Sequence, residues 1–136
     1  MVERGAPVSV PTVLVVDDND DIRELAQLCL ETVDGWVVLT AGSGPDAIAA
    51  AREHHPDAVL LDMMMPEMDG LTTFEHLQSD ESTRDIPVLL FTAKLQARDR
   101  QVWEGTAIRG TIAKPFDPMT LGAEVSRTLQ WAPEKD

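Results

Sequence analysis

The 136-residue sequence has few cysteines and few basic residues, and both shortages limit what the protein can do. Cys29 is the single cysteine, so no disulfide framework can form within the chain. The 11 Lys and Arg residues are outnumbered by 24 Asp and Glu residues, which gives a formal net charge of −13. Because a charge of this sign repels a phosphate backbone, we expect no direct binding to nucleic acid.

Long apolar runs are also missing from the sequence. The longest unbroken runs have only a handful of residues, which is too short to span a membrane. The opening "MVERGAPVSV" has no apolar segment of signal-peptide length, so we expect a cytoplasmic protein without membrane insertion. The chain length suits one domain. We expect a disordered or extended segment at 1–10, a folded domain at 11–131 and a frayed tail at 132–136.

Short apolar runs alternate with amphipathic segments in a regular order. The runs predict strands at 12–16, 36–40, 57–62, 86–92 and 110–114. The amphipathic segments predict helices at 20–33, 43–54, 71–79, 96–105 and 118–131. This alternation is typical of an α/β fold, in which helical crossovers join parallel strands and cover both faces of the sheet. Continuous apolar strands are expected in such a sheet.

Polar side chains follow four of the predicted strands at the ends where they stop. Asp17 and Asp18 follow the first strand, Asp62 ends the third, Thr92 ends the fourth and Lys114 ends the fifth. The carboxyl ends of parallel strands share one edge of the sheet, so we expect these side chains to meet there. Three carboxylates in contact repel one another unless a cation such as Mg²⁺ lies between them. A carboxylate in that position can attack phosphorus, and an ammonium and a hydroxyl can hold phosphoryl oxygens.

Each of these residues also has a plain structural interpretation. Asp62 suits a turn, Thr92 suits a strand, and Lys114 can extend along the surface towards water. The N-cap of the first helix stays open among the three residues that follow the acidic pair, which are Asn19, Asp20 and Asp21. The combination of four strand ends, rather than any one residue, favours a chemical site.

Four motifs carry a resemblance to a known family. The segments "VLVVDDNDDIREL", "AVLLDMMMPEMDG", "VLLFTAK" and "GTIAKPFD", in this order and at these separations, resemble the receiver domain of two-component response regulators. The similarity runs from about Thr12 to Leu129. It implies a flavodoxin-like (βα)5 doubly wound sandwich with a five-stranded parallel sheet in the order 2-1-3-4-5. It also makes the folded domain at 11–131 a receiver domain.

The resemblance implies a role for each residue at the strand ends. Asp62 matches the phosphoacceptor, Thr92 the switch hydroxyl and Lys114 the invariant-type lysine, which is followed by a cis peptide to Pro115. The implied Mg²⁺ site consists of Asp17, Asp18, Asp62 and the backbone carbonyl of Met64.

The function implied by the resemblance is phosphorylation-controlled signalling. A sensor histidine kinase or a histidine phosphotransfer protein would donate a phosphoryl group to Asp62, and slower hydrolysis would remove it. We expect a stand-alone receiver without an output domain, which acts on a downstream protein target and catalyses only its own phosphotransfer and dephosphorylation. The alternative is a degenerate receiver that serves as an unphosphorylated protein-binding scaffold.

One position departs from the family pattern. Thr111 lies where the fifth strand usually bears Tyr or Phe, and the sequence contains no Tyr. We expect signalling to use the loop after Thr92 and the next helix, where Trp103 either forms a contact surface or packs into the core. Two other classes fit less well. An FMN-binding module needs a phosphate loop unlike "DDNDD", and an aspartyl phosphatase needs a second acid that "LDMMMP" lacks.

Overall fold

Five strands form one parallel sheet in the computed structural model, which describes residues 10–63, 65, 68–92 and 107–131. The strands are β1 (Thr12–Val16), β2 (Val37–Ala41), β3 (Ala58–Asp62), β4 (Val88–Thr92) and β5 (Ile108–Ala113). Their order in the sheet is β2-β1-β3-β4-β5, and every neighbouring pair is parallel. The predicted flavodoxin-like fold and the strand order 2-1-3-4-5 are therefore confirmed.

Four helices are described, and their ends follow ordinary capping chemistry. They are α1 (Asp20–Thr32), α2 (Gly44–His54), α3 (Gly70–Ser79) and α5 (Leu121–Leu129). Asn19 is the N-cap of α1, because its side chain accepts hydrogen bonds from the backbone N–H groups of Asp21 and Ile22. Ser43 caps α2 in the same way. The helix predicted at 96–105 lies outside the described residues.

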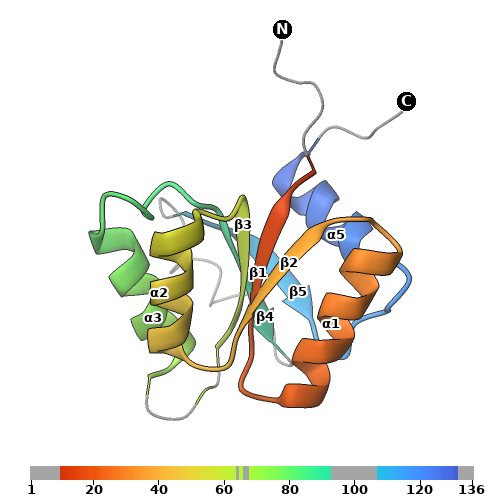
Figure 1. Cartoon of the computed structure of the whole chain (residues 1–136), viewed down its shortest axis with the longest axis horizontal. Helices are drawn as coiled ribbons and strands as arrows, with labels where there is room; N and C mark the ends of the chain where they lie inside the picture. The colour runs from red at the N-terminus through yellow and green to blue at the C-terminus, as the bar shows by residue number, and fades with distance from the viewer. Residues whose placement is uncertain (1–9, 64, 66–67, 93–106, 132–136) are drawn as a thin grey trace, which may run out of the picture.

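The helices divide between the two faces of the sheet, with α1 and α5 on one face and α2 and α3 on the other (Figure 1). Side chains alternate along each strand, so Val13 and Val15 join the core under α1 and α5, whereas Leu14 and Val16 join the core under α2 and α3. Burial of a large apolar side chain contributes roughly 1.5–3 kcal/mol. The described residues contain no helix of the length and apolar character that a membrane crossing requires.

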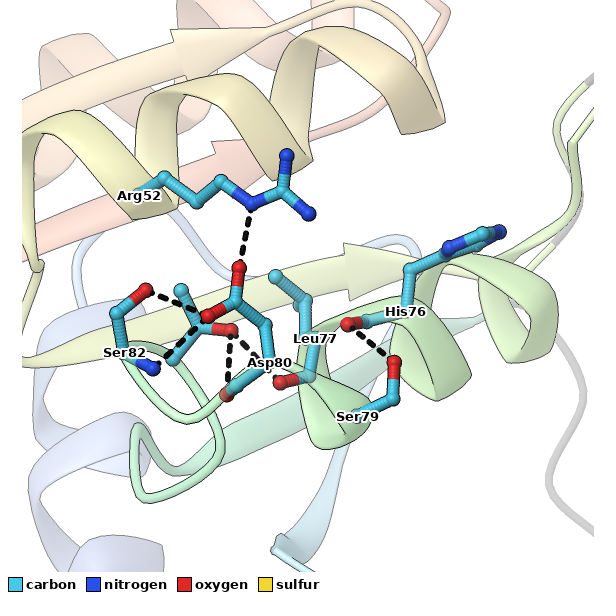
Figure 2. Close-up of polar contacts among 7 residues, drawn as sticks. Arg52, His76, Leu77, Ser79, Asp80 and Ser82 are labelled. Atoms are coloured by element: carbon cyan, nitrogen blue, oxygen red, sulfur yellow. Dashed lines mark hydrogen bonds and ion pairs between the residues drawn. The ribbon is translucent and has the colours of Figure 1, made fainter.

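Two helices on one face are tied together by an ion pair. Arg52 in the last turn of α2 pairs with Asp80, which follows α3 (Figure 2). The other oxygen of Asp80 accepts hydrogen bonds from the backbone N–H of Ser82, at 2.9 Å, and from its hydroxyl, at 2.8 Å. These bonds from Ser82, together with Arg52, lower the pKa of Asp80 to about 2. The contact fixes the turn that leads into β4.

Candidate functional site

The strand ends bring charged residues together on one face of the sheet. Asp17 continues the alternation of Val13 and Val15, which belong to the core under α1 and α5. Asp62 and Lys114 continue the same alternation, because each comes two residues after a strand residue that is buried in that core. The parallel register pairs Val16 with Leu61 and Asp62 with Phe91, so the ends of β1, β3 and β4 lie level. The alternation therefore directs the three charged side chains towards one another.

The acidic residues of this site form a tight group. One carboxylate oxygen from each of Asp17, Asp18 and Asp62 lies within 4.8 Å of the others. Asp17 is 0% exposed and Asp62 is 3% exposed, whereas Asp18 is exposed to solvent. Burial of two carboxylates is costly without compensating charge. The group thus combines two buried acids with one that faces water.

Lys114 supplies one compensating charge. Its Nζ donates a hydrogen bond to Oδ2 of Asp17 at 3.0 Å and lies 3.4 Å from Oδ1 of Asp62. The ammonium also lies 5.2 Å from the centre of the Phe91 ring, within the range of a cation–π contact. Burial acts to lower the pKa of Lys114, but the hydrogen bond and charge of Asp17 and the charge of Asp62 outweigh it and raise that pKa. Lys114 therefore stays a cation beside the two buried acids.

Asp17 is held from both its backbone and its side chain. Its backbone N–H donates to the carbonyl of Ala41 at 3.1 Å, and its Oδ1 accepts from the backbone N–H of Asn19 at 2.9 Å. Its carbonyl accepts from Nη1 of Arg23 at 2.8 Å. These contacts leave little freedom for the segment between β1 and α1.

Gly70, the first residue of α3, lies close to the backbone at the end of β3. The backbone N–H of Gly70 donates to the carbonyl of Met63 at 3.1 Å. A Cβ on Gly70 would lie 2.6 Å from the Cα of Met63 and closer still to the carbonyl oxygen of Asp62, so a side chain cannot fit there. Met65 belongs to the core under α2 and α3, and Met63 packs against that core. Met64 lies outside the described residues.

The other predicted site residues have mixed outcomes. Thr92 ends β4, where its backbone pairs with Ala113, but its side chain is outside the described part of the structure. Trp103 also lies outside it. The Lys114–Pro115 peptide is cis, as the resemblance implied. Thr111 lies in β5 and is half-buried.

Two contributors to the site were missed by reasoning from the sequence. Phe91 lies beneath the Lys114 ammonium, and Arg23 reaches the carbonyl of Asp17. The position of Phe91, next to Thr92 at the end of a predicted strand, was the available signal for the first. The second had no such signal, because a basic residue in the first turns of a helix is ordinarily exposed.

The donor set of the acidic group fits a hard divalent cation. All three side chains offer carboxylate oxygen, the ligand type that Mg²⁺ prefers, and Mg²⁺ commonly binds through one or two carboxylates and several waters. The single ammonium of Lys114 leaves the three carboxylates with excess negative charge. These residues could therefore hold Mg²⁺ at the carboxyl ends of the strands.

Comparison with known proteins identifies the family. The family model described as the response regulator receiver domain matches residues 13–126, and the chain belongs to this family. The family is one of signalling domains rather than of classical enzymes.

Curated relatives include transcriptional regulators. The chain is 43% identical over 112 residues to the probable transcriptional regulatory protein TcrX of Mycobacterium tuberculosis, across 82% of this chain and 45% of the relative. It is 36% identical over 121 residues to the DNA-binding dual master transcriptional regulator RpaA of Synechocystis, across 89% of this chain and 50% of that protein. The chain thus spans about half the length of these relatives.

Solved structures show the same fold. The chemotaxis protein CheY4 of Vibrio cholerae superposes with a TM-score of 0.81 at 28% identity, over 88% of this chain and 99% of that one. The receiver domain of the sensor histidine kinase PA1611 from Pseudomonas aeruginosa has a TM-score of 0.76 at 25% identity, over 90% of this chain and 99% of that one. Its structure contains a magnesium ion in the active-site cleft.

Proposed function

We propose that Asp62 accepts a phosphoryl group from a phosphohistidine and that the phosphorylated domain switches its protein interactions. The observation that carries this proposal is the placement of the Lys114 ammonium between the buried carboxylates of Asp17 and Asp62. A buried carboxylate beside a fixed ammonium suits attack on a group whose oxygens are negatively charged. Membership of the receiver family supports the same assignment.

In the proposed reaction an oxygen of the Asp62 carboxylate attacks phosphorus. A new P–O bond forms, the P–N bond to the donor histidine breaks, and the imidazole nitrogen keeps the electron pair. Lys114 is 15% exposed and lies 3.4 Å from Asp62, so its ammonium is near enough to hold a phosphoryl oxygen. The Thr92 hydroxyl is proposed to hold another. Water later attacks phosphorus, the P–O bond to Asp62 breaks, and inorganic phosphate leaves while the carboxylate of Asp62 is restored.

The proposed cation site consists of Asp17, Asp18 and Asp62, with the backbone carbonyl of Met64 assigned by the family resemblance alone. When bound, Mg²⁺ supplies positive charge that offsets the negative charge of the phosphoryl oxygens. Asp18 is the exposed member of the group, and we propose that it receives the ion from solvent. Asp17 and its hydrogen bond from Asn19 hold the inner side of the site.

The proposed partners are a sensor histidine kinase or a histidine phosphotransfer protein as donor and a downstream protein as target. We keep the proposed limits of the receiver at 11–131, with 1–10 and 132–136 outside it. A stand-alone receiver stays a prediction, because the first relatives are about twice as long as the match. A cytoplasmic location and the absence of direct nucleic-acid binding also stay predictions, the latter because RpaA is named as DNA-binding.

Intact mass spectrometry after incubation with acetyl phosphate tests the proposal. The wild type with Mg²⁺ should gain the mass of one phosphoryl group, and EDTA should prevent the gain. Asp62→Asn should gain none. Asp46→Asn is the matched control, because Asp46 is an exposed acid in the first turn of α2 and should leave the adduct unchanged.

The outcomes separate the candidate functions. An adduct on Asp62→Asn at the wild-type level places the nucleophile elsewhere. If no variant gains mass, beryllofluoride titration distinguishes rapid hydrolysis from an inactive site, since it forms a stable mimic of the phosphorylated acid. Failure of the wild type to bind beryllofluoride favours the unphosphorylated scaffold.

A further inference from the structure

Arg23 connects three segments that surround the acidic group. Its Nη1 donates a hydrogen bond to the carbonyl of Asp17 at 2.8 Å, and its Nη2 pairs with the carboxylate of Asp20. The guanidinium also lies against the loop after β2, because a Cβ on Gly42 would lie 3.0 Å from Nη1. One side chain thus contacts the residue that follows β1, the first turn of α1 and the loop that follows β2.

The hydrogen bond from Arg23 to the Asp17 carbonyl affects how the carboxylates of Asp17 and Asp18 are oriented. This carbonyl belongs to the peptide unit that joins Asp17 to Asp18, and a peptide unit is planar. A donor that fixes the carbonyl therefore fixes the plane of that unit and restricts the directions in which the two side chains leave the backbone. The bond from Asn19 to Oδ1 of Asp17 then sets the rotation of the first carboxylate.

The ion pair with Asp20 does not explain the placement of Arg23 by itself. The Asp20 side chain is 75% exposed, and ion pairs of this kind contribute little to stability. The charge of Arg23 also repels any cation that approaches Asp17 and Asp18. A guanidinium here can favour cation binding only by holding the ligands in position.

We propose that Arg23 is a positioning residue, which holds the Asp17–Asp18 peptide in the geometry that selects Mg²⁺ over Ca²⁺. The inference depends on the cation site of the proposed function. Mg²⁺ requires near-octahedral ligands at about 2.0–2.1 Å, whereas Ca²⁺ accepts looser geometry at about 2.3–2.6 Å. A site whose ligands are held less firmly should therefore lose affinity for Mg²⁺ before it loses affinity for Ca²⁺.

Calorimetric titration of the whole chain with Mg²⁺ and, separately, with Ca²⁺ tests this role. In Arg23→Gln we expect Mg²⁺ affinity to fall about tenfold, the lower range for loss of a group that supports metal ligands, with a smaller change for Ca²⁺. The ratio of the two dissociation constants is the readout, because lower stability alone does not change it. Arg127→Gln is the matched control, since it removes the same charge from an exposed position in the last turn of α5.

A second variant tests the position of the guanidinium without a change of charge. It also replaces Arg23→Gln as the test if that variant folds poorly. Gly42→Ala displaces the guanidinium through the 3.0 Å contact and changes no charge. We expect Gly42→Ala to shift the ratio of the Mg²⁺ and Ca²⁺ dissociation constants in the same direction as Arg23→Gln, and by a smaller factor. Circular dichroism of each variant without metal shows whether it is folded.

Each outcome of the titrations either supports or overturns the role of Arg23. A lower preference for Mg²⁺ in both Arg23→Gln and Gly42→Ala supports it. An equal gain in affinity for Mg²⁺ and Ca²⁺ in Arg23→Gln shows a pure charge effect and overturns the positioning role. An unchanged ratio of the two dissociation constants in both variants also overturns it. If the wild type binds no Mg²⁺, the proposed cation site fails, and the inference about Arg23 fails with it.

Discussion

Nζ of Lys114 lies 3.0 Å from Oδ2 of Asp17, although 97 residues separate them in the chain. The same ammonium lies 3.4 Å from Asp62, so one cation is shared by two carboxylates that are almost fully buried. Removal of one member of a buried charge cluster leaves the others without compensation. The stability of the metal-free fold and the chemistry of the site should therefore depend on the same lysine.

Replacement of Lys114 by Met should destabilise the metal-free protein. We expect the free energy of unfolding to fall by about 3–5 kcal/mol, because two buried carboxylates lose their ammonium partner. Added Mg²⁺ should restore part of the loss, since it supplies charge to the same acids. Urea unfolding with and without Mg²⁺ measures both effects. Arg84→Met, at an exposed position, is the control, and an equal loss in it would contradict the prediction.

Replacement of Gly70 by Ala should disturb the segment after Asp62. The added Cβ would overlap the backbone at Asp62 and Met63, which cannot move as a side chain can. We expect a loss of about 1–3 kcal/mol, the range for overpacking, together with weaker Mg²⁺ binding. Thermal unfolding and calorimetry measure these effects. Leu71→Ala, one residue further along α3 at an exposed position, should leave Mg²⁺ binding unchanged.

Asp34 and Gly122 should show strong energetic coupling. A Cβ on Gly122 in α5 would overlap the carboxylate of Asp34, which lies between α1 and β2. In an Asp34→Ala background, Gly122→Ala should stabilise the protein by about 0.5–1 kcal/mol, the usual gain from Gly to Ala in a helix. In the wild-type background, where Asp34 is present, Gly122→Ala should stabilise the protein less or destabilise it. A double-mutant cycle by urea unfolding measures the coupling, and equal effects in the two backgrounds would disprove the contact.

Asp80 should make stability depend on pH in the acid range. Hydrogen bonds from Ser82, together with Arg52, lower its pKa from the ordinary 3.8 to about 2. A lowered carboxyl pKa adds stability that is fully present above pH 3.8 and is lost as the pH falls through 2. Asp80→Asn should therefore melt at a lower temperature than the wild type at neutral pH.

The pH dependence of this difference is the critical measurement. The gap in melting temperature between wild type and Asp80→Asn should stay constant above about pH 4 and narrow as the pH falls towards 2. Asp57→Asn is a comparison variant at an exposed acid, which accepts a hydrogen bond from the backbone N–H of Thr12. A gap for Asp80→Asn that keeps its size down to pH 2 would show that the carboxylate charge does not stabilise the turn.

The strands and the strand-end acids could be predicted because their signals are local. β1 and β3 are buried on both faces, so they are continuous apolar runs, and the observed ends at Val16 and Asp62 match the predicted ends. Polar residues after such runs mark one edge of a parallel sheet, which is why the positions of Asp17, Asp62 and Lys114 could be read from order alone. Helix ends were less certain. α5 stops at Leu129 rather than Trp131, because Gln130 has a left-handed conformation.

The contacts that make the site specific were decided by the tertiary structure. The sequence by itself determined the type of fold and the group of charges at the strand ends, whereas the structure decided that Asn19 caps α1. The sequence did not determine that Phe91 lies beneath Lys114, that Arg23 binds the carbonyl of Asp17, or that Asp34 lies against Gly122. Each of these contacts depends on strand register, helix rotation and the packing of distant segments, and none of these is encoded by the pattern of neighbouring residues.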